Sequence, residues 1–226
     1  MSFSIIIPVL NEEGVINDVI NRVWNLDGAS GTEIIVSDGG QDCRTLDAII
    51  SDDVIKVRSP RGRGRQMNEG AGYAAGDILL FLHADTELPL NALSLVGNAM
   101  QDGHYAGGAF DLAIKSPHPL FRMIELSASL RSRITRIPFG DQAIFMRKDY
   151  FDTMGGYRDI PIMEDVEIMK RVKKKGDSIV ILRSRVATSS RRWDSEGIVR
   201  CTLRNWLLQA LYPLGVSPHT LVRLYK

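Results

Sequence analysis

The chain has 226 residues, of which 44% are hydrophobic and 24% are charged, as in ordinary globular proteins. Its 28 lysines and arginines nearly balance its 27 acids, so the net charge of +1 gives no sign of a nucleic-acid partner. We find no apolar stretch long enough to span a membrane and no signal-peptide layout. The two cysteines, Cys43 and Cys201, have no metal-site spacing. We therefore expect a single-domain cytoplasmic protein.

The first half of the chain alternates strand-like and helix-like segments. Short apolar runs predict strands at 3–9, 33–37, 54–57 and 77–82, and apolar residues at helical spacing predict helices at 15–26, 46–50 and 66–75. This alternation is typical of right-handed βαβ units, which form a mostly parallel, Rossmann-like sheet flanked by helices. Ligands of such sheets bind beyond the carboxyl ends of the strands, here residues 8–13, 38–42 and 83–87.

The second half is less regular. It predicts strands at 109–114, 142–146 and 178–182, and helices at 120–134, from 148, and at 164–174 and 198–212. The helix at 164–174 has acids in its first turn, lysines in its last turn and Gly176 as its stop.

Residues 61–87 carry the strongest candidate site. An Arg/Gly loop leads into a helix and a buried strand, which ends in His83-Ala84-Asp85. In an extended tripeptide the first and third side chains share a face, so His83 and Asp85 could both reach one divalent ion or phosphate. The competing interpretation is that Asp85 caps a turn and that the arginines are solvated.

Other candidates are weaker when each is taken alone. Asp38 could accept hydrogen bonds from a base or ribose, or could simply begin an Asp-Gly-Gly turn. Glu164 and Asp165 could supply a general base, although acids are favoured at a helix start in any case. Arg192 and Trp193 could contact a sugar or base, or could stack on each other at the surface.

The order of these motifs is more specific than any one of them. In chain order the motifs are P-x-x-N-E-E after a strand, D-G-G-x-D, G-x-G-x-x-x-N-x-G, x-A-D, G-G-Y and E-D before a helix. Together they resemble family-two glycosyltransferases of the GT-A fold, and the resemblance covers residues 3–193. Three stretches are more similar still to a bacterial subgroup described as radical-SAM/selenodomain-associated transferases. They are GRGRQMNEGAGYAAGDILLFLHADTELP, MEDVEIMKRVKKKG and SSRRW.

The resemblance implies a nucleotide-sugar-dependent enzyme, with a UDP-sugar as the favoured donor and Mn²⁺ or Mg²⁺ as cofactor. It implies a nucleotide-sugar half at 1–105, an acceptor and catalytic half at 106–193, and a helical tail at 194–226. It assigns Asp165, with Glu164, to catalysis and Asp85, with His83, to the metal. Donor-binding residues would be Pro8, Asn11, Glu12, Asp38, Arg63, Arg65, Asn68 and Asp85. The acceptor and sugar region would hold Gly107, Gly108, Asp141, Arg192 and Trp193.

Two departures from the family pattern limit this interpretation. His83 replaces the first acid of D-x-D, and imidazole suits Mn²⁺ or another transition metal better than Mg²⁺. Ser189 replaces the Gln of Q-x-x-R-W, so a processive polymer synthase is disfavoured. Two other classes stay open, namely a nucleotidyltransferase, which would release pyrophosphate, and a catalytically silent nucleotide-sugar-binding module.

The final predicted helix is amphipathic, with Arg200 and Arg204 beside its apolar residues. Core packing or the seam of a homo-oligomer is the default interpretation. Peripheral contact with the inner face of a membrane, where a lipid-linked acceptor would lie, is the alternative. The sequence does not identify the acceptor.

Overall fold

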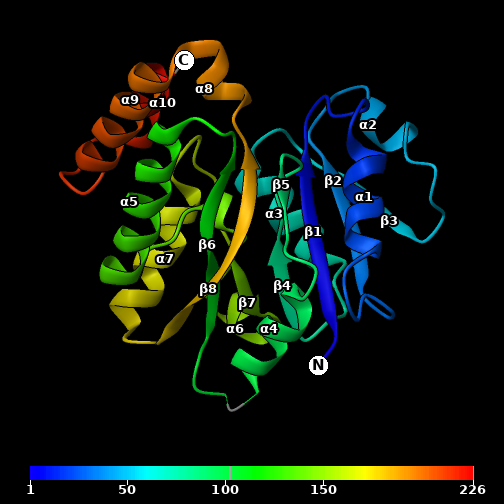
Figure 1. Ribbon diagram of the computed structural model, residues 1–226. Coiled ribbons are helices and arrows are strands. Elements are labelled where there is room, and N and C mark those ends of the chain that lie inside the picture. Colours follow the sequence, from blue (N-terminus) through cyan, green and yellow to red (C-terminus); the bar gives the residue numbers. More distant parts are fainter. Residues whose placement is uncertain (102, 226) are drawn as a thin grey trace.

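The computed structural model describes residues 1–101 and 103–225 (Figure 1). Its strands are β1 (Phe3–Val9), β2 (Glu33–Asp38), β3 (Val54–Arg58), β4 (Ile78–Phe81), β5 (Thr86–Glu87), β6 (Gly107–Lys115), β7 (Phe145–Arg147) and β8 (Ile179–Ser189). Among the described residues they form one sheet in the order β3-β2-β1-β4-β7-β6-β8-β5. The pairs β1–β2, β2–β3, β1–β4 and β6–β8 are parallel, as expected for βαβ units.

Helices cover the sheet and extend beyond its last strands (Figure 1). They are α1 (Ile16–Trp24), α2 (Arg44–Asp47), α3 (Arg63–Gly72), α4 (Ala92–Met100), α5 (Pro119–Thr135), the 3-10 helix η1 (Gly140–Gln142), α6 (Lys148–Thr153), α7 (Glu164–Lys175), α8 (Arg191–Glu196), α9 (Ile198–Leu211) and α10 (Pro218–Tyr225).

The sheet separates two hydrophobic layers because successive residues of a strand face opposite sides. Ile5 and Ile7 of β1 pack in the layer with α1, α2 and α4, whereas Ile6 packs in the layer with α3, α6 and α7. A third cluster joins Met163 and Val166, at the start of α7, to Leu208 of α9 and Leu221 of α10. The C-terminal helices therefore pack against the segment that contains Asp165.

The predicted strands and most predicted helices are confirmed, except that the strand predicted at 142–146 begins only at Phe145, after η1. Other differences affect the site. Helix α3 begins at Arg63 rather than at Gln66, so Arg63 and Arg65 lie in its first turn and not in a loop. Strand β8 continues to Ser189 rather than ending at Leu182, because a bulge lets it pair with β6 along its length. Strand β5 and helices α4, α8 and α10 were not predicted.

Gly107 and Gly108 lie inside the sheet, between β7 and β8. A Cβ atom on Gly107 would lie 2.3 Å from the carbonyl oxygen of Phe145, and one on Gly108 would lie 2.3 Å from that of Val180. These glycines allow three strands to approach closely. The resemblance placed them in the acceptor region, but they are not among the residues that line the cleft described below.

We expect Gly108→Ala to lower the free energy of unfolding by about 1–3 kcal/mol, because backbone and buried side chains must shift to admit the methyl group. Gly72→Ala is the matched control. Its Cβ would meet no atom within 4 Å, and alanine is favoured in a helix, so this change should raise the free energy of unfolding by about 0.5–1 kcal/mol. Urea unfolding measures both, and equal effects would contradict the close-approach role.

Candidate active site

A cleft of about 430 Å³ gathers charged residues from several segments of the chain. Arg63 comes from the first turn of α3, His83 and Asp85 from the connection between β4 and β5, Asp141 from η1 and Asp165 from α7. Helices α5 and α9 contribute further lining residues, some apolar and some polar. The cleft therefore combines carboxylates, a guanidinium group and apolar surface, which is the usual make-up of a ligand site.

Asp165 is held in place by backbone donors on both of its carboxylate oxygens. The amide of Gly140 donates to Oδ2 at 2.6 Å, and the amide of Val166 donates to Oδ1 at 2.7 Å. Each oxygen has a second acceptor position. The carboxylate thus lines the cleft with a fixed orientation and with capacity to accept one more proton or hydrogen bond.

Glu164 has a different environment from Asp165. Its side chain is 4% exposed and its Oε1 lies 2.9 Å from Nε of Arg63. Burial raises the pKa of Glu164, an effect that Arg63 opposes, while Glu164 is the main cause of a raised pKa of Arg63. Glu164 is not among the cleft-lining residues, so its contact with Arg63 positions that guanidinium at the cleft.

His83 and Asp85 both line the cleft, but the tripeptide that contains them is not extended. The amide of Thr86 donates to the carbonyl of His83 at 3.0 Å, which closes a turn, and the amide of Ser189 donates to the carbonyl of Asp85 at 3.0 Å. The prediction from strand alternation was therefore wrong about the backbone. Backbone hydrogen bonds to the turn, not a shared strand face, bring both side chains to the cleft.

Burial lowers the pKa of His83, and the nearby guanidinium of Arg63 lowers it further. The imidazole is thereby favoured in its neutral form, which is the form that can bind a metal ion. A Cβ atom on Gly140 would lie 2.9 Å from Cε1 of His83, so glycine at position 140 leaves space for the imidazole.

Asp141 lies in η1, where burial is the main cause that raises its pKa to about 6, and the negative charge of Asp165 adds to the shift. Arg131 of α5 opposes this effect, and its guanidinium carbon lies 3.4 Å from the centre of the Phe139 ring. Sequence reasoning missed Arg131 and Phe139, because an arginine on an amphipathic helix is usually solvated.

The expected nucleotide-side residues lie at the carboxyl ends of β1 and β2. Asp38 is 1% exposed; its Oδ1 accepts a hydrogen bond from the Gly40 amide at 2.8 Å, and its Oδ2 has no partner among the described residues. Pro8 pairs with Ser37, and Asn11 adopts a left-handed backbone conformation with φ 57°. Glu12 lies close enough to Asp85 for that charge to raise its pKa, although burial is the larger cause.

Arg65 and Asn68 make contacts other than those the resemblance implied. Arg65 forms an exposed ion pair with Asp159 at 2.5 Å, and it is not a cleft-lining residue. The side-chain amide of Asn68 donates to the carbonyl of Tyr157 and accepts from its backbone amide, each at 2.8 Å. Asn68 thereby fastens α3 to the Gly155-Gly156-Tyr157 turn.

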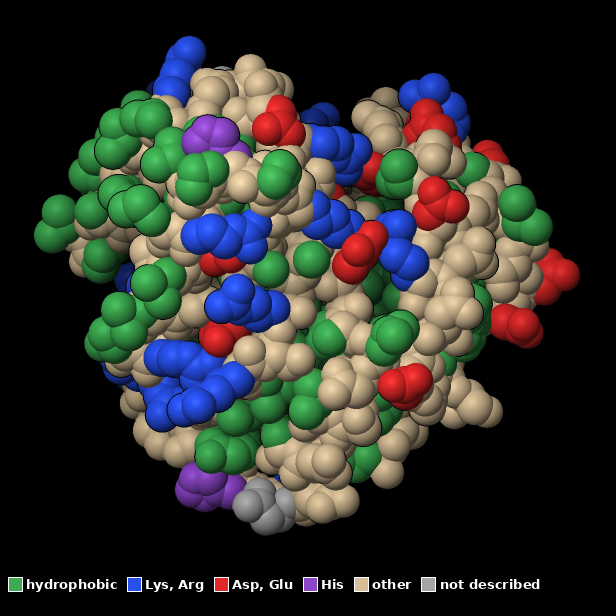
Figure 2. Space-filling model, viewed as in Figure 1, with side chains coloured by type: hydrophobic (Ala, Val, Ile, Leu, Met, Phe, Trp, Pro, Cys, Tyr) green, Lys and Arg blue, Asp and Glu red, His purple; other side chains and the backbone are tan. Residues whose placement is uncertain are grey.

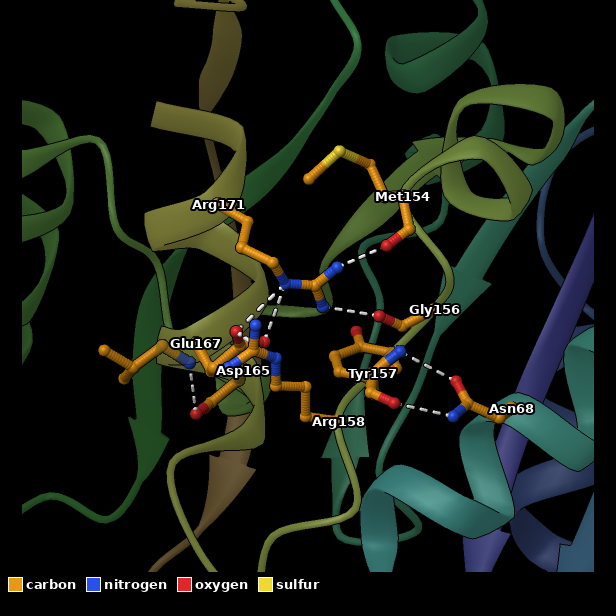
Figure 3. A network of polar contacts seen from close by, with 9 residues as sticks. Asn68, Met154, Gly156, Tyr157, Arg158, Asp165, Glu167 and Arg171 are labelled. Carbon is orange, nitrogen blue, oxygen red and sulfur yellow. Dashed lines mark hydrogen bonds and ion pairs between the residues drawn. The ribbon is translucent and has the colours of Figure 1, made fainter. Parts of the chain in front are cut away.

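Figure 3 shows how that turn is joined to α7, which carries Asp165. Arg171 contacts Glu167 at 2.9 Å and donates to the carbonyls of Met154 and Gly156. Arg158 lies 3.0 Å from the same Glu167 carboxylate. These contacts link the segment before α7 to the helix itself, and so fix the position from which Asp165 enters the cleft.

Arg192 and Trp193 of α8, which the resemblance assigned to the acceptor and sugar region, line the cleft. The Trp193 ring packs edge-on against Phe121, with ring centres 5.6 Å apart, and its indole N–H donates to Thr202 at 3.2 Å. The guanidinium of Arg192 lies over the Tyr225 ring rather than over Trp193. The two residues therefore do not form the mutual surface stack that was the competing interpretation.

The cleft offers few protein ligands for a metal ion. In the described part of the chain, no three His, Cys, Asp or Glu side chains are grouped as a metal site. Asp85 and His83 provide one carboxylate and one imidazole. This pair fits a divalent cation such as Mn²⁺ that takes its remaining ligands from a bound diphosphate and water.

Residues 4–158 match glycosyl transferase family 2. The chain belongs to this family. No match was found among curated proteins. The GT-A fold, a mostly parallel sheet flanked by helices in a single domain, is confirmed, whereas the narrower subgroup and the division into halves stay predictions.

Two similar solved structures illustrate this fold. The mannosyltransferase PcManGT from Pyrobaculum calidifontis, in complex with GDP-Man and Mn²⁺, is 18% identical with a TM-score of 0.70, over 96% of this chain and 65% of that chain. TarS 1-349 of S. aureus, in complex with UDP, is 16% identical with a TM-score of 0.66, over 84% of this chain and 60% of that chain. The present chain thus spans less than two thirds of either.

Proposed function

We propose that the protein transfers a sugar from a nucleoside-diphosphate donor to an acceptor hydroxyl, with inversion at the anomeric carbon and without processive polymerisation. The observation that carries the proposal is the cleft itself. It holds a backbone-anchored carboxylate, Asp165, together with a guanidinium group, Arg63, and the strand-end acid Asp85. Membership of glycosyl transferase family 2 supports this use of the cleft.

In this proposal Asp165 is the general base. As the acceptor oxygen attacks the anomeric carbon, the hydroxyl proton passes to a carboxylate oxygen of Asp165, and the bond between the anomeric carbon and the diphosphate oxygen breaks. The products are a glycosylated acceptor and a nucleoside diphosphate. The hydrogen bonds from Gly140 and Val166 fix the base before reaction, which reduces the cost of orienting it.

Arg63 would stabilise the leaving diphosphate, because Glu164 orients its guanidinium at the cleft. Asp85 and His83 would hold a divalent cation, which supplies positive charge to the diphosphate when bound. The unpaired Oδ2 of Asp38 would accept an N–H of the nucleotide base. The preference for a UDP-sugar rests on the family resemblance, since both uracil and guanine carry a ring N–H.

Asp165→Asn is expected to lower kcat by about 10²–10⁴-fold, because the amide cannot take the acceptor proton, while the Kd for donor changes little. Asp159→Asn, an exposed acid paired with Arg65, is the control and should retain activity. The measurement is turnover at saturating nucleotide sugar, with the released nucleotide identified. Normal turnover together with lost donor binding would contradict the base assignment, and release of pyrophosphate would indicate a nucleotidyltransferase.

Arg63→Gln should weaken UDP binding about tenfold, since a charge-assisted contact to phosphate is lost while the amide can still contact Glu164. Arg65→Gln removes the same charge two residues away, at the Asp159 pair, and should change the Kd by less than about twofold. Calorimetry with UDP measures both. Equal weakening by the two variants would show that Arg63 acts only through the overall charge of α3.

Asp85→Ala should abolish the gain in UDP affinity that Mn²⁺ produces, because the carboxylate ligand of the cation is removed. Asp42→Ala is the matched control, since Asp42 is an exposed acid beyond the end of β2 that pairs with Arg44. Calorimetry with and without Mn²⁺ tests the difference. An affinity for UDP that Asp85→Ala leaves unchanged in both conditions would remove the metal role.

A further inference from the structure

Helix α5 exposes most of its large apolar side chains, and beside Phe121 it buries two polar residues. Met123, Leu126, Leu130 and Ile134 recur every three or four residues, form one stripe and are 53% to 71% exposed. On the opposite face Glu125 and Ser132 are buried, with Glu125 2% exposed. A helix between a protein core and water usually exposes polar side chains, so a stripe of four exposed large apolar side chains points to a contact with an apolar surface.

Helix α9 likewise exposes large apolar side chains, although its buried face also holds Leu208. Val199, Leu203, Trp206 and Leu207 lie on its exposed face and are 50% to 60% exposed, while Cys201 and Thr202 are buried. Figure 2 shows hydrophobic side chains gathered on the side of the molecule formed by α5 and α9. We call these eight residues of the two helices the apolar face.

The apolar face borders the cleft. On α5, residues that lie between those of the stripe line the cleft, namely Ile124, Ser127 and Ala128. Asn205 and Trp206 of α9 line it as well, and Trp206 belongs both to the cleft lining and to the apolar face. A surface that covers the apolar face would therefore lie next to the opening of the cleft.

The charges of the C-terminal segment, which contains α9 and α10, have one sign. From Gly197 to the end of the sequence there are four basic residues and no acid. Arg200, which adjoins Val199 on α9, and Arg223, which adjoins Leu224 on α10, are exposed and make no ion pair among the described residues. Free cations at the edge of an exposed apolar stripe are complementary to an anionic lipid surface.

We propose that the apolar face, with Arg200 and Arg223, docks on a membrane surface that contains anionic phospholipid. Trp206 suits the interface, where an indole ring can be partly in lipid and partly in water. A second copy of the chain fits less well, because a twofold interface would gather the unpaired cations of both copies while the segment from residue 197 onward offers no acid to pair with them. None of the described helices is long and apolar enough to cross a bilayer, so the contact is peripheral.

Combined with the proposed function, this docking would place the cleft beside membrane-borne acceptors. The docking itself does not depend on catalysis, and it is tested without any sugar donor. Failure of vesicle binding would therefore leave the transferase assignment standing, and loss of transferase activity would leave the docking result standing.

The test is flotation of the full chain with phosphatidylcholine vesicles that contain or lack phosphatidylglycerol. The wild-type chain should float with the anionic vesicles and stay below the neutral ones. The double variant Leu126→Glu/Leu203→Glu should bind the anionic vesicles at least about tenfold more weakly, since two apolar side chains are replaced by carboxylates. Both positions are exposed, so the fold should be retained, and circular dichroism checks this.

Ile50→Glu/Tyr73→Glu is the matched control, because both residues are exposed apolar positions outside α5 and α9. This variant should float like the wild type. Arg200→Gln and Arg223→Gln should each reduce partitioning into anionic vesicles by about fivefold, and added salt should reduce it as well.

Three outcomes would overturn the proposal. The first is a wild-type chain that does not bind anionic vesicles, and the second is equal loss of binding by the control and the Leu126/Leu203 variant. The third is that the wild-type chain is a dimer in light scattering, that the Leu126/Leu203 variant is a monomer, and that neither protein binds vesicles. That result would assign the apolar face to contact with a second copy.

Discussion

The Arg63 guanidinium lies among carboxylates that the chain brings together from separate segments. Glu164, Asp165, Asp141 and Asp85 all raise its pKa, and Glu164 contributes most. Without this cation, Glu164 would be buried with no opposite charge beside it, and the cleft-lining acids Asp85, Asp141 and Asp165 would repel one another, which is costly at low dielectric. The first turn of α3 therefore has a structural task as well as a chemical one, and the placement of the acids depends on it.

The start of α7 shows how the rest of the fold supports this arrangement. Met163 and Val166 are packed by α9 and α10, while Asn68 and Arg171 fix the preceding turn from the other side. Asp165 thus depends on contacts from both halves of the chain and from the C-terminal helices. Backbone hydrogen bonds and packing orient its carboxylate, while Arg63 offsets its negative charge.

The βαβ half was predictable because buried parallel strands read as short apolar runs, and the carboxyl ends of β1, β2 and β4 located Pro8, Asp38 and Asp85. The sequence could not separate Arg63 from Arg65, since one turn of helix decides which guanidinium meets the cleft. The resemblance placed Gly107 and Gly108 in the acceptor region, whereas in the structure they allow close packing of strands inside the sheet. Arg131 gave no signal, because its role requires Phe139 and Asp141 to fold beside it.

In the His83–Asp85 motif, the turn that closes at Thr86 makes the backbone conformation independent of the side chain at residue 83. Hydrogen bonds to the carbonyls of His83 and Asp85 fix the backbone, so the position of Asp85 does not depend on which side chain occupies residue 83. A substitution at residue 83 therefore leaves the backbone of the turn in place, provided that the new side chain fits the space beside Gly140. Under the proposed metal role, the motif could therefore change its ligand atoms, and with them its preferred metal, without a change in the backbone of the turn.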